Sequence, residues 1–314
     1  MNKLLCLLIC CYFIAPCPSL ANVGPTAPAL AFQQLAKASY QSSIHIPLKR
    51  VGNLFFIEAR IDDRIGNFVL DLGAPYLVLN STYFRDYKVD ERYTSGTLLS
   101  EADYVKRIKV KRLELNGLQL DNLSADVTDL GQIENQKDIK ILGLLGVALF
   151  EDYLFDLDVL NKQLVLHKNW ETVDVDAEMV LKAPIVVQNN VISLKAKCQK
   201  VTLYLSLDTG SEKNIIDNKL PQKVYNQMKI LKTSTIRDGN GKKTEALLTV
   251  MDGIFVEEIK LRKMYTIVLN LKTLSRAYGR RIDGMLGYPF FSLGRVFIDF
   301  KDKKLSVYQF KPRE

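Results

Sequence analysis

Short apolar runs separated by turn residues dominate the chain from residue 44 onward. The runs at 54–61 and 67–70 flank a polar turn, which is the pattern of a β-hairpin. The dipeptide Asn116-Gly117 separates two further strand-like runs, and this dipeptide is a strong signal for a tight hairpin turn. Comparable pairs of runs return after residue 190. The pattern therefore predicts strands along most of the chain.

Helical patterns are short and few. Residues 221–231 are expected to form one helix, because Pro221 stands where proline is tolerated at a helix start. One-turn helices are expected at 147–153 and 289–294. The fold class predicted is mostly β, with two homologous β-barrel-like lobes and a few short helices.

The second half of the chain repeats the first at a spacing of 137 positions at the aspartates and 141 positions further along. A spacing of about 140 residues is the size of a small domain rather than of a solenoid repeat, so it favours internal duplication into two lobes. The aspartates Asp71 and Asp208 are 137 positions apart. The following pairs are each 141 positions apart: Leu144 and Met285, Leu145 and Leu286, Gly146 and Gly287, Phe150 and Phe291, Asp158 and Asp299, Lys162 and Lys303, Leu166 and Val307.

Each half delivers one aspartate from an apolar strand into a glycine turn. The first turn reads Asp71-Leu72-Gly73-Ala74 and the second reads Asp208-Thr209-Gly210-Ser211. An aspartate in such an apolar setting is costly unless it is paired or used. Two carboxyl groups that share one proton can supply both the base and the acid needed to hydrolyse an amide with water. The glycine that follows lets the backbone turn sharply and approach closely.

With these two turns and the elements Leu144-Leu145-Gly146 and Met285-Leu286-Gly287, the chain resembles an aspartic protease of the retropepsin or pepsin type. The resemblance covers about residues 44–310 and takes the two-lobed, single-chain form. It implies that the catalytic residues are Asp71 and Asp208. It further implies support from the other turn residues, namely Gly73, Ala74, Thr209, Gly210 and Ser211, and packing of the two apolar-apolar-Gly elements beneath the turns.

The first turn departs from the family pattern at Leu72, where threonine would hydrogen-bond to the opposite lobe. In one interpretation Leu72 packs between the lobes, Thr209 bonds to backbone alone, and the chain is an aspartic endopeptidase. In the other, the first site has decayed and the chain binds peptides or envelope partners without cleavage. A second asymmetry is that Ser211 can donate to a carboxylate, whereas Ala74 cannot. We therefore expect Asp208 to carry more of the charge and Asp71 more of the shared proton.

The family also closes a β-hairpin flap over its bound peptide. The glycine-rich tip that contains Gly239, Asn240 and Gly241 is the candidate flap in the second half, although an ordinary exposed hairpin fits equally well. The equivalent stretch 93–104 in the first half has no clear flap signature. The sequence leaves open which lobe supplies a cover.

The N-terminus has the pattern of a secretory signal, with Lys3, an apolar run at 4–15 and a small-residue cleavage site at 19–21. We expect export to the periplasm or beyond the cell after cleavage; lipidation at Cys17 is the less favoured alternative. Only Cys198 remains outside this segment, so no internal disulfide is expected. The domain division predicted is signal peptide 1–21, linker or short helix 22–43, first protease lobe 44–168, interlobe connection 169–184 and second protease lobe 185–314.

The composition and charge of the chain give no sign of a further function. The net charge of +8 is scattered, without the basic stripe and interleaved aromatics of a nucleic-acid-binding surface. The two histidines stand in no metal-ligand spacing, so neither a metal nor a cofactor is expected. The mature chain contains no other stretch that could span a membrane. The expected partner is a peptide or protein substrate, and the expected state is a monomer.

Overall fold

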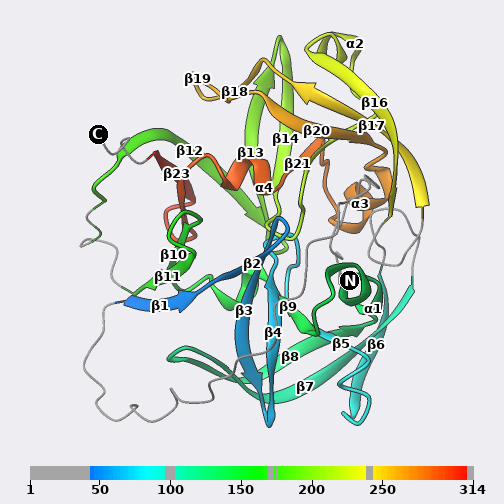
Figure 1. Cartoon of the computed structure of the whole chain (residues 1–314), viewed down its shortest axis with the longest axis vertical. Helices are drawn as coiled ribbons and strands as arrows, with labels where there is room; N and C mark the ends of the chain where they lie inside the picture. Colours follow the sequence, from blue (N-terminus) through cyan, green and yellow to red (C-terminus); the bar gives the residue numbers. More distant parts are fainter. Residues whose placement is uncertain (1–42, 96–102, 169–172, 174, 238–242, 310–314) are drawn as a thin grey trace, which may run out of the picture.

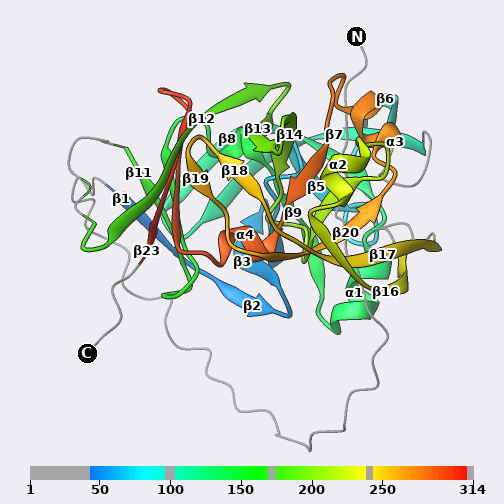
Figure 2. The same cartoon turned by 90° about the horizontal axis from the view of Figure 1, so that it is seen from above.

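Two β lobes and a sheet shared between them make up the structure (Figure 1). The computed structural model describes residues 43–95, 103–168, 173, 175–237 and 243–309. In Figure 1 the first lobe lies below, the second lobe above, and the shared sheet to the left; Figure 2 keeps the shared sheet on the same side. The mostly β fold predicted from the sequence is confirmed.

The first lobe is a closed barrel of six strands. The ring runs β3-β4-β9-β5-β8-β7, and it closes because β7 pairs back onto β3 between Arg60 and Glu114. Strands β2 and β6 extend the ring at β3 and β7. The strands are β2 (Lys49–Val51), β3 (Leu54–Ile61), β4 (Arg64–Leu70), β5 (Leu77–Asn80), β6 (Val89–Ser95), β7 (Asp103–Leu115), β8 (Leu118–Thr128) and β9 (Ile141–Leu145).

The second lobe repeats this strand order as β13-β14-β21-β15-β20-β17-β16. Parallel pairs occur at equivalent places, β4–β9 and β5–β8 in the first lobe and β14–β21 and β15–β20 in the second. The closure differs, because the short strand β18 pairs with β13 after β17 has ended. The strands are β13 (Val191–Cys198), β14 (Val201–Leu207), β15 (Asn214–Asp217), β16 (Met228–Arg237), β17 (Lys243–Met251), β18 (Ile254–Val256), β19 (Ile259–Lys260), β20 (Met264–Leu269) and β21 (Gly284–Leu286).

The shared sheet joins the lobes in the order β1-β11-β10-β22-β23-β12. At its centre β10 pairs with β22, which occupies the equivalent position in the second half. Across this pair Arg295 donates two hydrogen bonds, of 2.7 and 2.6 Å, to the fully buried carboxylate of Asp156, and His167 lies 2.8 Å from the same group. The strands are β1 (Ser43–Pro47), β10 (Leu154–Asp158), β11 (Gln163–His167), β12 (Glu178–Gln188), β22 (Arg295–Asp299) and β23 (Lys304–Gln309).

Short helices complete the fold. Two of them, α1 (Gly131–Lys137) and α3 (Lys272–Ala277), were not predicted, since they are too short to show helical periodicity. They lie at equivalent places in the repeat and contribute to apolar clusters outside the barrels. The 3₁₀ turn at Val147–Leu149 and α4 (Tyr288–Phe291) lie close to the predicted one-turn helices.

The predicted helix at 221–231 is wrong in its extent. Only α2 (Gln222–Tyr225) is helical, and from Met228 the chain joins β16. The antiparallel ladder from β16 to β17 supplies hydrogen bonds along ten residues, which a short helix could not match. The predicted connection at 169–184 also includes the first part of β12.

The N-terminal signal segment and the predicted linker to residue 42 lie outside the described residues. Within the described part of the chain, no helix has the length and apolar character needed to cross a membrane.

Candidate functional site

The two aspartate turns have the same backbone surroundings in both lobes. Asp71 follows β4, and its amide donates to the carbonyl of Leu145, at the end of the parallel neighbour β9, at 3.0 Å. Asp208 follows β14, and its amide donates to the carbonyl of Leu286, at the end of β21, at 3.0 Å. The predicted packing of the apolar-apolar-Gly elements beneath the turns is what the structure contains.

Glycine is required where these elements meet the turns. A Cβ atom added at Gly146 would lie 2.5 Å from the carbonyl oxygen of Ala74, and one added at Gly287 would lie 2.5 Å from that of Ser211. Contacts this short do not occur for real Cβ atoms. The glycines therefore let the strand end and the aspartate turn approach at van der Waals distance.

The two carboxyl groups cross over the lobe boundary. A Cβ atom on Gly73 would lie 2.5 Å from the carboxyl carbon of Asp208, and one on Gly210 would lie 2.6 Å from Oδ1 of Asp71. Each aspartate thus packs on the glycine of the opposite turn. The structure brings together the two aspartates and the two turn glycines that the sequence singled out, from positions 137 residues apart.

Both carboxyl groups are removed from solvent, since Asp71 is 1% and Asp208 2% exposed. Burial raises the pKa of Asp71 well above its ordinary value, and the charge of Asp208 raises it further. Burial raises the pKa of Asp208 to about 6, while hydrogen bonds from Asp71 and from backbone amides counteract this rise. Oxygen Oδ2 of Asp71 and Oδ1 of Asp208 are buried without a hydrogen-bond partner among the described atoms. The pair therefore presents two unused oxygens and retains a proton more readily than ordinary aspartates.

Of the two equivalent positions, Thr209 and Leu72, only Thr209 has a hydroxyl that joins the turns. Its hydroxyl donates to the carbonyl of Leu70 at 2.8 Å and accepts from the amide of Leu72 at 2.9 Å. Both partners belong to the opposite lobe. The Leu72 side chain is 1% exposed and lies in the apolar core that residues of both lobes form. This geometry agrees with the interpretation in which Leu72 packs between the lobes and Thr209 bonds to backbone alone.

The expected role of the Ser211 hydroxyl is wrong. This hydroxyl donates to the carbonyl of Lys213 at 2.7 Å, in its own loop, because the following turn places that acceptor nearer than a carboxylate. The amide of Ser211 instead helps to lower the pKa of Asp208, as does the amide of Gly210. The field of Asp208 raises the pKa of Asp71, so the proton is still expected on Asp71, for a different reason.

Sequence reasoning missed an ion pair beside the second turn. Glu212 follows Ser211 directly, and its carboxylate pairs with Lys137 at the end of α1; both side chains are less than 10% exposed. The amide of Asn53 in the first lobe donates to the same carboxylate at 3.0 Å. The repeat gave no signal for this ion pair, because the equivalent positions in the other half are Tyr278 and Pro75; only Asn53 has an equivalent asparagine, Asn190, 137 positions away.

The predicted flap tip at Gly239, Asn240 and Gly241 lies outside the described residues, as do residues 96–102. The strands that lead to both tips are described. They form the long hairpins β6–β7 and β16–β17, and both views show these hairpins on the same side of the molecule (Figures 1 and 2). Each lobe thus contains such a strand pair, and the assignment of the flap to Gly239, Asn240 and Gly241 stays a prediction.

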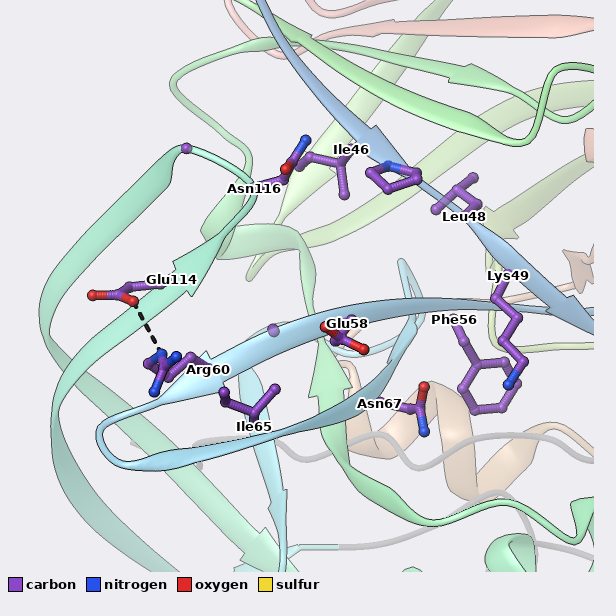
Figure 3. A pocket seen from close by; sticks show the side chains of 13 residues that line it. Ile46, Leu48, Lys49, Phe56, Glu58, Arg60, Ile65, Asn67, Glu114 and Asn116 are labelled. Atoms are coloured by element: carbon purple, nitrogen blue, oxygen red, sulfur yellow. Dashed lines mark ion pairs between the residues drawn. The ribbon is translucent and has the colours of Figure 1, made fainter. Parts of the chain in front are cut away.

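A groove of about 650 Å³ lies on the outer face of β3 and β4, bordered by the chain at 46–49 and the β7–β8 turn (Figure 3). None of its lining residues belongs to either aspartate turn, so it is not the site of the paired carboxyl groups. Within the described ranges, no group of three or more His, Cys, Asp or Glu side chains is placed to hold a metal ion.

Residues 57–149 match the family model described as aspartyl protease, and this segment includes Asp71 and Gly73. The match confirms the resemblance drawn from the sequence. No curated protein matches the chain. Solved structures do match, among them basic 7S globulin from soybean, with 10% identity over 85% of this chain and 95% of that chain and a TM-score of 0.48.

Proposed function

We propose that this chain, a relative of the retropepsin- and pepsin-like aspartic proteases, is an aspartic endopeptidase that uses Asp71 and Asp208. The observation that carries the proposal is the crossed packing of the two buried carboxyl groups, each on the glycine of the opposite turn. Leu72 does not remove this arrangement, since Thr209 still bonds to backbone groups on both sides of Asp71, the carbonyl of Leu70 and the amide of Leu72.

The chemistry follows from the surroundings of the two carboxyl groups. Backbone amides of Gly210, Ser211 and Gly73 favour the charged form of Asp208, so Asp208 is assigned as the ionised member, which accepts a proton from water as that water attacks the peptide carbonyl. Burial and the charge of Asp208 raise the pKa of Asp71, so Asp71 is assigned the shared proton, which it donates to the carbonyl oxygen. Asp208 then gives the proton taken from water to the amide nitrogen, the carbon–nitrogen bond breaks, and a hydroxyl of the tetrahedral intermediate returns a proton to Asp71, which releases the amine and the carboxylic acid. Because the carboxyl groups titrate as a pair, the activity is expected to follow a bell-shaped pH profile with two apparent pKa values.

The substrate class proposed is an extended peptide that lies between the lobes, beside the hairpins β6–β7 and β16–β17. One chain supplies both aspartates, so a monomer suffices for the reaction. The repeated strand order supports an origin by duplication. The signal pattern at 1–21 supports action after export.

The test is to purify the chain from residue 22 and to incubate it with a peptide library between pH 3 and pH 8, beside Asp71→Asn and Asp208→Asn variants. Cleavage that both substitutions abolish supports the proposal. Asp302→Asn is the matched control, because this aspartate lies on the surface, where it pairs with Lys304. Peptide binding without cleavage at any pH would refute the enzyme and favour a binding protein.

A further inference from the structure

The residues that end α1 and α3 are equivalent positions of the repeat. Lys137 and Tyr278 are 141 positions apart, the spacing that relates the two halves in this region. Each side chain crosses the lobe boundary to the loop that carries the aspartate of the opposite lobe. Lys137 pairs with Glu212 behind the second turn, and the Tyr278 hydroxyl donates to the carbonyl of Gly73 in the first turn at 2.9 Å. Figure 1 shows α1 and α3 on the same side of the molecule, near the junction of the lobes.

Two asparagines make a second set of equivalent contacts. The amide group of Asn53 donates to the carbonyl of Glu212 at 3.5 Å, and that of Asn190 donates to the carbonyl of Pro75 at 3.3 Å. The donors are 137 positions apart, and so are the acceptors. Contacts across the lobe boundary from these asparagines, and from Lys137 and Tyr278, therefore occur in both halves. The contact of a turn threonine with the opposite turn occurs only from Thr209, because Leu72 occupies the equivalent position.

From this arrangement we propose that Tyr278 is a positioning residue for Asp71. Its hydroxyl supplies an interlobe hydrogen bond to the first turn, in place of the one that Leu72 cannot make. The inference deepens the proposed function and rests on it for its catalytic meaning. Tyr278 is 1% exposed, so water cannot readily replace its hydroxyl at the carbonyl of Gly73. With Thr209 and Asn190, it forms the set of second-lobe donors on the first turn.

The effect on Asp71 passes through one peptide group. The carbonyl of Gly73 and the amide of Ala74 share that group, so donation from Tyr278 to the carbonyl fixes and polarises the amide. The amide of Ala74 donates to the backbone carbonyl of Asp71 at 3.1 Å, and the amide of Gly73 donates to Oδ1 of Asp71 at 2.9 Å; both amides lower the pKa of Asp71. Asp208 is the charged group that acts on Asp71 among the described residues. Loss of the Tyr278 hydroxyl should therefore weaken amide donation and raise the pKa of Asp71.

The test compares Tyr278→Phe with Tyr225→Phe. Tyr225 is a matched control, since its hydroxyl donates to the carbonyl of Asp217 at 2.7 Å within the second lobe. Tyr278→Phe should move the alkaline limb of the pH–kcat profile up by about half a pH unit and lower kcat more than it changes KM. Tyr225→Phe should leave both limbs in place.

A readout that does not depend on turnover is amide hydrogen exchange in the first turn. Tyr278→Phe should speed exchange at residues 72–74 by roughly 3- to 10-fold, with the equivalent amides 209–211 less affected. Asn190→Gly is a second variant, because Asn190 has φ of 58° and glycine keeps that backbone conformation while removing the donor. Unchanged exchange in both variants, or an equal change in Tyr225→Phe, would overturn the positioning role. If the wild-type chain cleaves nothing, the proposed function fails and the exchange experiment still decides the role of Tyr278.

Discussion

Replacing Thr209 with valine tests the one-sided tie between the catalytic turns. Valine keeps the shape of threonine and removes its hydroxyl. The change deletes two hydrogen bonds and leaves the carbonyl of Leu70 and the amide of Leu72 without that partner in a buried region. An unsatisfied buried group costs about 1–3 kcal/mol, so the loss of unfolding free energy should be about 2–4 kcal/mol. The midpoint of thermal unfolding should fall by roughly 5–10 °C.

The matched control is Thr249→Val. Thr249 is 1% exposed, and its hydroxyl donates to the carbonyl of Thr266 at 2.9 Å, far along the chain from either aspartate. This variant should lose about 1 kcal/mol, because one buried carbonyl loses its donor. Urea unfolding of both variants at pH 5 gives the two free energies.

Catalysis separates the two variants further. Thr209→Val should lower kcat at least about tenfold, because the turn that carries Asp71 is no longer fixed relative to Asp208. Thr209→Ser, which keeps the hydroxyl, should recover most of the loss, and Thr249→Val should stay within about twofold of the wild type. Equal stabilities of the two valine variants, with activity retained in both, would refute the argument that Thr209 joins the lobes.

Three further predictions concern charge. Burial raises the pKa of Asp208 in the folded protein to about 6. The stabilisation of the fold by protonated Asp208 is therefore fully present below its unfolded pKa near 4 and is lost as pH rises through 6. Asp208→Asn should therefore be more stable than the wild type at pH 8 by about 2 kcal/mol, and urea unfolding at pH 4 should show a smaller difference. Glu212→Gln removes the counter-charge of the buried Lys137 and should cost about 2 kcal/mol; a loss under about 0.5 kcal/mol in urea unfolding would contradict an interlobe role for this pair. Arg295→Met leaves Asp156 without its bidentate donor in the shared sheet and should cost about 3 kcal/mol at pH 7; an unchanged urea unfolding curve would refute the argument.

Much of the fold could be predicted from the sequence, because its signals are local or periodic. The apolar strands, the Asn116-Gly117 turn and the spacing between the halves predicted a repeated β architecture. The helices α1 and α3 could not be predicted, since they are held by apolar contacts outside the barrels rather than by their own periodicity. The extent of α2 was overpredicted because the residues from Met228 onward gain a ladder of backbone hydrogen bonds with the neighbouring strand β17.

The same distinction applies to the candidate site. The sequence alone determined that two aspartates follow apolar strands and precede glycines, and that only the second turn has a threonine. It could not determine the partner of a hydroxyl group. Ser211 bonds to Lys213 and Thr209 bonds across the lobes, although both side chains belong to the same turn.

The interlobe contacts were decided by the tertiary structure. Tyr278 reaches Gly73, and Lys137 reaches Glu212, from positions that no local pattern connects. The sequence determined that the chain is made of two equivalent halves, since equivalence is visible as a spacing. Only the fold decided how the halves hold each other, because a hydrogen bond depends on where two groups meet in space, and the same spacing brought threonine to one side of the junction and leucine to the other.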